Sequence, residues 1–376
     1  MLIRMARALL LMFLAVFDAS VSAAKHKIIV GSFRTGFLYT LEYDDEMRSL
    51  ALLAQSAVQA ASSWITLNHG KSKLYSTDWA ASEPTFASYA VTSHPPHIRL
   101  EKKVVGNRRC TGSKSIHVNA NPQRPHAVYG TYYYGTANCA TVFSVDANGT
   151  LDRVVQEYAL YPPDAGIHGT AFTPDGAYLL AADTKGNRIW THSLARESGE
   201  MALVDVIEGP VQGANPRHLA IHGTGRFVYV VLEGVSGLAT YGIAQGGRLE
   251  RVGPIYRLLR PGDDPAHFWA DEVSLSRSNR YLWATNRACE SRGKGYISVF
   301  EMAATGKIAR QISLRQTDTS GGLANSVAAC PFDEELAALT DSSRGFVQIW
   351  HVEEGVVAQL DIRDGGGCCA NAVWLD

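Results

Sequence analysis

The sequence predicts an all-β chain folded as a seven-bladed β-propeller, with its ring closed by pairing of the N- and C-terminal strands. Three observations lead to this prediction. An apolar-alternating segment recurs seven times at intervals of roughly fifty residues. Each copy contains short strand-like runs separated by polar turns, and the last copy ends with the chain, one strand into its unit. Four-stranded units repeated around an axis leave only short, protected sheet edges.

The seven copies predict the blades one by one. In each copy a strand-like run ends at a polar turn and a second apolar run follows, with a third and a fourth run less clearly marked. Clear turns are "PDG" at 174–176, before "AYLLAAD", and "HGTG" at 222–225, before "FVYVVLE". The copies begin, in chain order, with "SSWITLNHG", "SIHVNANPQ", "GIHGTAFTP", "NPRHLAIHG", "DEVSLSRSN", "ANSVAACPF" and "CCANAVWLD".

The two ends of the chain are expected to share one blade. The final copy supplies a single strand, and the segment "KIIVGSFRTGFLYTLEYDDE" near the N-terminus supplies the strands that this copy lacks. The repeats are evenly spaced and no low-complexity linker interrupts them. We therefore expect residues 24–376 to form a single propeller domain.

Composition and charge narrow the possible functions. The chain has 376 residues, 46% of them hydrophobic, with 34 Gly and 14 Pro, which suits a large core connected by many turns. A formal net charge of −1 argues against a nucleic-acid partner. The motifs of α/β-hydrolases, P-loop proteins and zinc proteases are absent from the sequence. The oligomeric state is left open.

The first 23 residues predict secretion. Residues 1–23 place Arg4 and Arg7 before a short apolar run, and Val21 and Ala23 before a cleavage point, which is typical of a signal peptide. The run is too short to span a membrane, and no other stretch approaches that length, so we expect a secreted protein without a membrane span. Asn148, in "NGT", would then be a glycosylation site.

Six cysteines could form up to three disulfides in an oxidising compartment: Cys110, Cys139, Cys289, Cys330, Cys368 and Cys369. One pair can be predicted from the expected strands. Cys110 precedes the inner strand of its unit and Cys139 follows the next strand, so both should lie toward the same mouth of the channel. We expect a bond between them. No spacing of these cysteines suggests a structural zinc site.

Strand counting brings four ionisable residues to one mouth of the channel. The starts of first strands and the ends of second strands gather there, which places His168 and Arg217 at strand entries and Glu233 and Arg287 at strand ends. Two guanidiniums suit a substrate with two or more carboxylates. The alternative is structural: His168 bonded to a backbone carbonyl, the arginines bonded to loop carbonyls, and Glu233 neutralising one of them.

Several segments carry a resemblance to a known family. They are "VGSFRTGFLYTLEYDDE", "GIHGTAFTPDGAYLLAADTKGNRIWTH", "NPRHLAIHGTGRFVYVVLE", "TDTSGGLANSVAACPFDEELAALTD" and "NAVWLD". Together they resemble the fungal carboxy-cis,cis-muconate cyclase family, within the seven-bladed lactonase propellers that include 6-phosphogluconolactonase-type proteins. The resemblance covers nearly all of the chain after the leader. It implies closure of a carboxylated muconate to its γ-lactone with no metal or organic cofactor.

The resemblance also implies roles for the four residues at the mouth. The family uses one His, two Arg and one Glu, which match His168, Arg217, Arg287 and Glu233 here. The arginines would bind the small polycarboxylate substrate and stabilise developing charge. His168 or Glu233 would deliver a proton, and His168 is preferred because its unperturbed pKa lies nearer neutrality.

Two features depart from the family pattern. Leu323 in "TSGGLANS" stands where the family has a His in "TSGGHSN", and a cyclase that handles an intracellular aromatic breakdown product has no obvious reason to be exported. These departures keep two alternatives open, a secreted lactone hydrolase and a non-catalytic secreted propeller. A metal-dependent lactonase is a further possibility, with Glu233, Asn325, Asn371 and Asp318 as the residues available for a metal.

Overall fold

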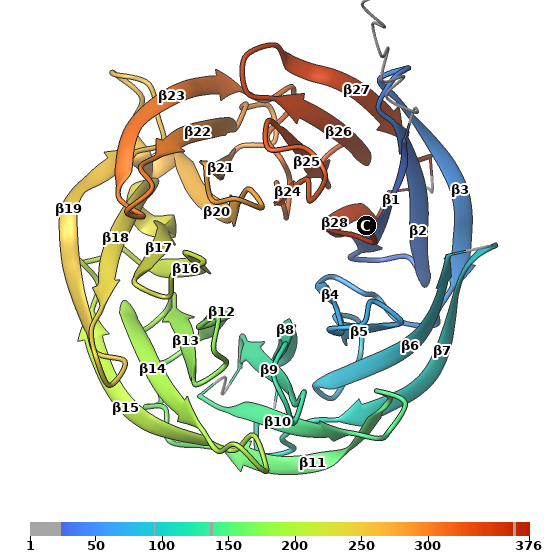
Figure 1. The fold of residues 1–376 in the computed structure, drawn as a ribbon, viewed down its shortest axis with the longest axis vertical. Helices are drawn as coiled ribbons and strands as arrows, with labels where there is room; N and C mark the ends of the chain where they lie inside the picture. The colour runs from blue at the N-terminus through green and yellow to red at the C-terminus, as the bar shows by residue number, and fades with distance from the viewer. Residues whose placement is uncertain (1–23, 94, 111, 136–137, 364–365) are drawn as a thin grey trace, which may run out of the picture.

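The computed structural model describes residues 24–93, 95–110, 112–135, 138–363 and 366–376 as a ring of seven four-stranded antiparallel sheets around a central channel (Figure 1). This confirms the predicted seven-bladed propeller. The signal peptide expected at residues 1–23 lies outside the described residues. Within the described ranges, no helix is both long enough and apolar enough to cross a membrane.

From the channel outward, the blades consist of β4 (Ile65–Leu67), β5 (Lys73–Asp78), β6 (Thr85–Ser93) and β7 (Pro96–Val105); β8 (Lys114–Ala120), β9 (Val128–Tyr133), β10 (Ala140–Val145) and β11 (Leu151–Tyr158); β12 (Ile167–Phe172), β13 (Tyr178–Asp183), β14 (Arg188–Leu194) and β15 (Met201–Glu208); β16 (Pro216–Ile221), β17 (Phe227–Leu232), β18 (Gly237–Ile243) and β19 (Leu249–Arg257); β20 (Phe268–Leu275), β21 (Tyr281–Ala288), β22 (Tyr296–Met302) and β23 (Ile308–Gln316); β24 (Val327–Ala329), β25 (Leu336–Asp341), β26 (Phe346–His351) and β27 (Gly355–Asp361); and β28 (Cys368–Trp374), β1 (Lys25–Ser32), β2 (Phe37–Asp44) and β3 (Ser49–Ala57). The described part of the chain also contains two single-turn 3-10 helices, η1 (Glu233–Val235) and η2 (Pro265–His267).

The burial of each strand follows from its place in the blade. Second strands are covered on both faces by neighbouring blades, and β5 and β25 are buried along their whole length. Fourth strands face solvent on one side, and β15 and β19 are largely exposed. Continuous apolar runs in second strands and polar residues in fourth strands are therefore what the architecture requires.

The blades are joined by apolar clusters between their faces. Leu180 and Ala182 of β13 pack with Val228 and Val230 of β17 in one fully buried cluster. The predicted turns are confirmed as well. Gly176 has a φ of 66° and donates its N–H to the carbonyl of Thr173, a left-handed conformation that glycine adopts without strain.

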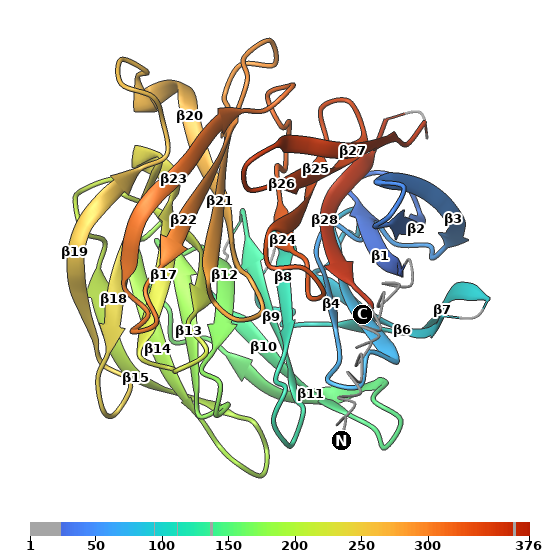
Figure 2. The same cartoon turned by 45° about the horizontal axis from the view of Figure 1, so that its top comes forward.

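One blade is built from both ends of the chain. β28 is its innermost strand and pairs antiparallel with β1, with Ile28 opposite Trp374 and Val30 opposite Ala372. Figure 2 shows β28 beside the N-terminal strands β1 and β2, and Figure 1 shows that β28 is the strand of this blade nearest the channel. The indole of Trp374 also donates to the carbonyl of Ala328 in the preceding blade. The predicted closure of the ring is therefore confirmed.

The cysteines form two disulfides. Cys110 and Cys139 are bonded, as predicted, and the adjacent Cys368 and Cys369 are bonded to each other. Cys289 and Cys330 are free. The upper limit of three disulfides is therefore not reached.

Removing residues 370–376 should open the ring and lower the free energy of unfolding by at least about 3–5 kcal/mol, the cost of deleting one large buried side chain such as Trp374. Two unpaired sheet edges would also be exposed. Thermal and chemical denaturation measure the effect. A chain that ends at Trp374 is the control, because it keeps β28 and should remain close to the full chain. Equal stability of both truncations would contradict the closure.

Candidate active site

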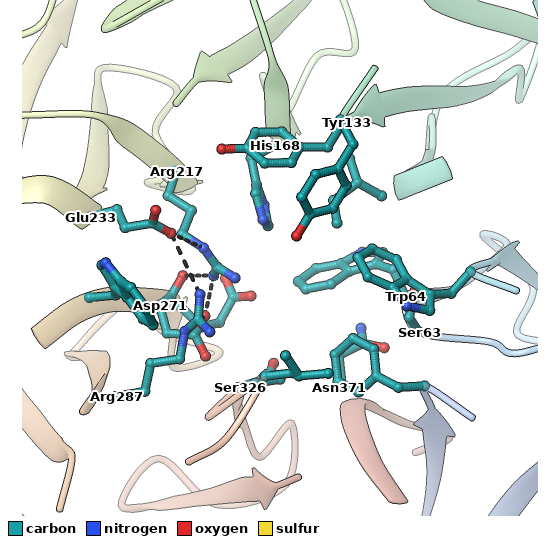
Figure 3. A pocket seen from close by; sticks show the side chains of 18 residues that line it. Ser63, Trp64, Tyr133, His168, Arg217, Glu233, Asp271, Arg287, Ser326 and Asn371 are labelled. Atoms are coloured by element: carbon teal, nitrogen blue, oxygen red, sulfur yellow. Dashed lines mark hydrogen bonds and ion pairs between the residues drawn. The ribbon is translucent and has the colours of Figure 1, made fainter. Parts of the chain in front are cut away.

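A cavity of about 400 Å³ lies at the mouth of the channel where inner strands begin and second strands end (Figure 3). His168 comes from β12, Arg217 from β16 and Arg287 from β21, while Glu233 is the first residue of η1, directly after β17. All four line this one cavity. Their convergence agrees with strand counting, and their catalytic roles stay predictions.

A fifth charged residue, Asp271 of β20, lies at the centre of the site. Its carboxylate contacts Nη1 of Arg217, and that nitrogen also donates to the backbone carbonyl of Asp271 at 2.6 Å. The Asp271 side chain is only 2% exposed. Asp271 is not among the site residues predicted from the sequence, although it holds the same strand-entry position as His168 and Arg217 and could have been found by strand counting.

The two arginines are tied to carboxylates to different degrees. Arg217 Nε lies 2.8 Å from Oε2 of Glu233, so both carboxylates hold this guanidinium closely. Arg287 is held loosely, with Nη2 3.7 Å from Glu233 Oε2 and Nε 3.6 Å from Asp271 Oδ1. It donates to the carbonyl of Gly322 and lies over the ring of Trp269. Arg287 is therefore the arginine more available to a ligand.

The charges of this cluster balance, because both guanidiniums that the sequence assigns to a substrate also lie near the carboxylates of Glu233 and Asp271. Two buried cations require nearby anions because the loss of hydration is costly. Burial lowers the pKa of Arg217, but Asp271 and Glu233 outweigh it, so that its pKa lies above its ordinary value. Burial also raises the pKa of Asp271, and Arg217 and Arg287 bring it below the usual value. Both groups are charged at neutral pH.

His168 faces the cavity from the wall beside the arginines (Figure 3). Its Nδ1 lies 2.8 Å from Nε2 of His218, so the partner is a second histidine and not a backbone carbonyl. Burial lowers the pKa of His168 well below 6.5, and the positive charge of Arg217 adds to this effect. The imidazole is therefore neutral at pH 7. The preference for His168 as proton donor rests on its unperturbed pKa, and burial and Arg217 move the pKa well below that value.

The outer part of the cavity is apolar. Three residues line it that are 49%, 39% and 48% exposed: Tyr134, Trp269 and Leu323. Leu323, the position where the resemblance implies a His, thus lies on the cavity wall, and its N–H donates to Oγ of Ser342. A ligand in this cavity would contact charged side chains at the inner end of the cavity, its floor, and apolar side chains at the outer end, its rim.

The residues considered for a metal do not form one ligand set. The Asn371 amide exchanges hydrogen bonds with the backbone of Ile65, and Asp318 accepts from Gln348 and does not line the cavity. Asn325 donates its side-chain N–H to the carbonyl of Asn286. In the described ranges, no group of three or more His, Cys, Asp or Glu side chains is arranged to hold a metal ion.

Fold and site together define a propeller of the lactonase class. The sequence pattern described as "Lactonase, 7-bladed beta-propeller" matches residues 27–324. The carboxy-cis,cis-muconate cyclase of Neurospora crassa is 31% identical over 93% of this chain and 99% of its own length. Muconate cycloisomerase 1 of Cutaneotrichosporon cutaneum is 27% identical over 88% of this chain and 91% of its own.

The chain belongs to the carboxy-cis,cis-muconate cyclase family of seven-bladed lactonase propellers. Solved structures agree on the fold. The periplasmic gluconolactonase of Pseudomonas aeruginosa superimposes with a TM-score of 0.78 at 17% identity, over 94% of this chain and 99% of that one. A protein from Lactobacillus plantarum gives 0.76 at 18% identity, over 94% and 100%. The enzyme class is that of lactonising isomerases.

Arg217→Met should lower the free energy of unfolding by about 3–5 kcal/mol, because the buried Asp271 carboxylate loses its closest cation. Arg310→Met is the matched control. Arg310 pairs with Glu301 at 2.8 Å, but its side chain is 71% exposed, so the loss should stay below about 1 kcal/mol. Urea denaturation measures both. Equal losses in the two variants would mean that the buried cluster does not stabilise the fold.

Proposed function

We propose that this chain closes a small unsaturated di- or tricarboxylate, such as 3-carboxy-cis,cis-muconate, to its γ-lactone. The observation that supports this most directly is a single cavity with guanidinium donors on one wall and the His168 ring on the next. Membership in the cyclase family supports the same reaction class.

The chemistry requires one addition and one proton transfer. A substrate carboxylate oxygen attacks a carbon of a double bond conjugated to a second carboxylate, and one C–O bond forms. The π electrons move onto that second carboxylate as an enediolate. A proton then adds to the carbon that bears the second carboxylate, and this restores that carboxylate. The site must therefore bind carboxylates, stabilise the enediolate and supply a proton.

Arg287 takes the main role in binding. Its side chain is 13% exposed and held by pairs of 3.6 and 3.7 Å, so a substrate carboxylate can compete for its N–H groups. Asp271 and Glu233 fix the position of the Arg217 guanidinium. The developing enediolate is stabilised by donors that do not need to move.

His168 donates the proton either as a neutral imidazole or as an imidazolium that forms once the substrate is bound. Its pKa is depressed first by burial and then by the cations, and a bound polycarboxylate offsets the contribution of the cations. Glu233 acts in this proposal as a counter-ion to the arginines. The hydrolysis of a lactone in the same cavity is the alternative, favoured by the match to the lactonase pattern.

Arg287→Ala should weaken binding of 3-carboxy-cis,cis-muconate by about 1.5–3 kcal/mol, the range for a hydrogen bond to a charged group. His168→Ala should abolish turnover and leave that binding largely intact, because its role is proton transfer. Glu233→Gln should tighten binding, since a competing anion is removed. Calorimetry measures affinity, and loss of diene absorbance measures turnover, with a chelator present in a parallel assay.

The same assays contain the contradicting outcomes. Unchanged affinity in Arg287→Ala would make this arginine structural, and full turnover in His168→Ala would exclude it as the acid. Lost turnover in Glu233→Gln would move the acid role to Glu233. Hydrolysis of γ-lactones without diene closure would support the hydrolase, and failure to bind or convert either class would support a non-catalytic propeller. Chelator sensitivity would support a metal-dependent lactonase.

We also propose that the protein is exported and glycosylated. The leader at residues 1–23 supports export, and so do two disulfides, which persist in oxidising compartments. Asn148 is exposed in a turn between β10 and β11. Protein secreted by a eukaryotic host should begin near Ala24 and lose mass on enzymatic deglycosylation, and Asn148→Gln should abolish that loss. Retention of the full-length chain inside the cell would contradict export.

A further inference from the structure

We propose that Glu272, His218 and His168 form a proton relay that carries a proton through the floor of the active-site cavity to the substrate. The inference rests on the proposed lactonisation, because that reaction consumes protons. A carboxylate becomes a neutral ester while carbon gains hydrogen, so each turnover removes one proton from the medium. An acid that acts once must be protonated again before the next turnover.

The three side chains form a continuous hydrogen-bonded chain. Oε2 of Glu272 lies 2.5 Å from Nδ1 of His218, and Nε2 of His218 lies 2.8 Å from Nδ1 of His168. Both nitrogens of His218 are thus engaged, and Nε2 of His168 is the ring nitrogen left for a ligand. Oε1 of Glu272 accepts the backbone N–H of Val273, which leaves Oε2 for the histidine.

The relay lies between two cavities that share part of their lining. The second cavity measures about 480 Å³. His168 lines only the active-site cavity, His218 lines only the second one, and Glu272 lines both. A substrate that fills the first cavity would therefore leave the far end of the relay accessible from the second.

The backbone next to the relay leaves room for its central ring. Gly169 follows His168 in β12, and a Cβ at this position would lie 2.7 Å from Cδ2 of His218. Any side chain there would displace the imidazole. The dipeptide of His168 and Gly169 therefore supplies both the terminal member of the relay and the space for the next one.

Protonation states support the direction of transfer. Burial raises the pKa of Glu272 well above its ordinary value, and burial with the nearby Arg217 lowers the pKa of His218. The resting relay then holds a protonated carboxyl and two neutral imidazoles. Asp271, Arg287 and His117 are the other titratable groups that act on these histidines.

The transfer balances without a further reactant. His168 gives its Nε2 proton to the substrate carbon and receives one at Nδ1 from Nε2 of His218. His218 receives one at Nδ1 from the Glu272 carboxyl, which becomes a carboxylate. Solvent in the second cavity returns a proton to Glu272. Once the product has left, each histidine loses its Nδ1 proton and gains one at Nε2 by exchange with solvent in the cavity that it lines, which restores the starting state.

Glu272→Gln and His218→Asn test the relay in the full chain. With 3-carboxy-cis,cis-muconate, each should lower kcat by roughly 100-fold or more, the contribution of a positioned proton donor, while KM stays within about twofold. Because the groups act in series, the double variant should be no slower than the slower single variant. His117→Asn is the matched control and should keep kcat, since its ring lies beside His218 but bonds to Thr170.

Nitrogen-15 spectra of labelled histidine provide a readout that does not need turnover. His218 should be neutral with its proton on Nε2, and Glu272→Gln, which keeps the shape of the side chain, should shift the His218 Nδ1 resonance. A protonated His218, or one with its proton on Nδ1, would overturn the relay. The relay would also be overturned if the wild-type enzyme turns over and both variants keep a kcat within threefold of the wild-type value. An inactive wild-type protein would contradict the proposed function and leave the spectra to decide on the relay.

Discussion

The closing pair of strands, β28 against β1, is the constraint on which the site depends. The active-site cavity is lined by side chains from different blades, and no blade could hold them by itself. His168, Arg217 and Asp271 come from the entries of three successive inner strands, and their separation is set by how these blades pack around the axis. A closed ring fixes this packing because each sheet has a neighbour on both faces.

Burial of charge explains the electrostatics of the site. Arg217 and Asp271 are buried at the inner end of the active-site cavity and lose most of their hydration. Their close contact offsets part of the free-energy cost of this desolvation. The same burial keeps His168 and His218 neutral and favours the protonated form of Glu272. The charged pair of Arg217 and Asp271 therefore lies at one wall of the cavity. The three groups that can pass a proton on without gaining net charge lie next to this pair: His168, His218 and Glu272.

Much of this arrangement could be predicted from the sequence because it depends on repetition. Blade number, ring closure, the bond between Cys110 and Cys139, and the convergence of His168, Arg217, Glu233 and Arg287 all follow from counting strands. Asp271 and Glu272 follow from the same strand counting, because they open the copy "DEVSLSRSN" at the position that His168 and Arg217 hold in their own copies.

The remaining features depend on three-dimensional packing. The pKa of His168 is set by desolvation and by cations from other blades, which residue type alone does not indicate. The pairing of both arginines with carboxylates, and the bond between His168 and His218, fifty positions apart, likewise require distances. Leu323 departs in sequence from the pattern that the resemblance implies, and its place at the cavity rim depends on the structure.

A crystal structure with a saturated dicarboxylate such as adipate, which cannot cyclise, would test the central claim most directly. The account predicts one carboxylate within hydrogen-bonding distance of the Arg287 guanidinium and the ligand chain against Nε2 of His168, with the Arg217 and Asp271 contact unchanged. Adipate bound only in the second cavity would contradict this account. So would adipate bound at saturating concentration with no carboxylate in hydrogen-bonding distance of Arg287.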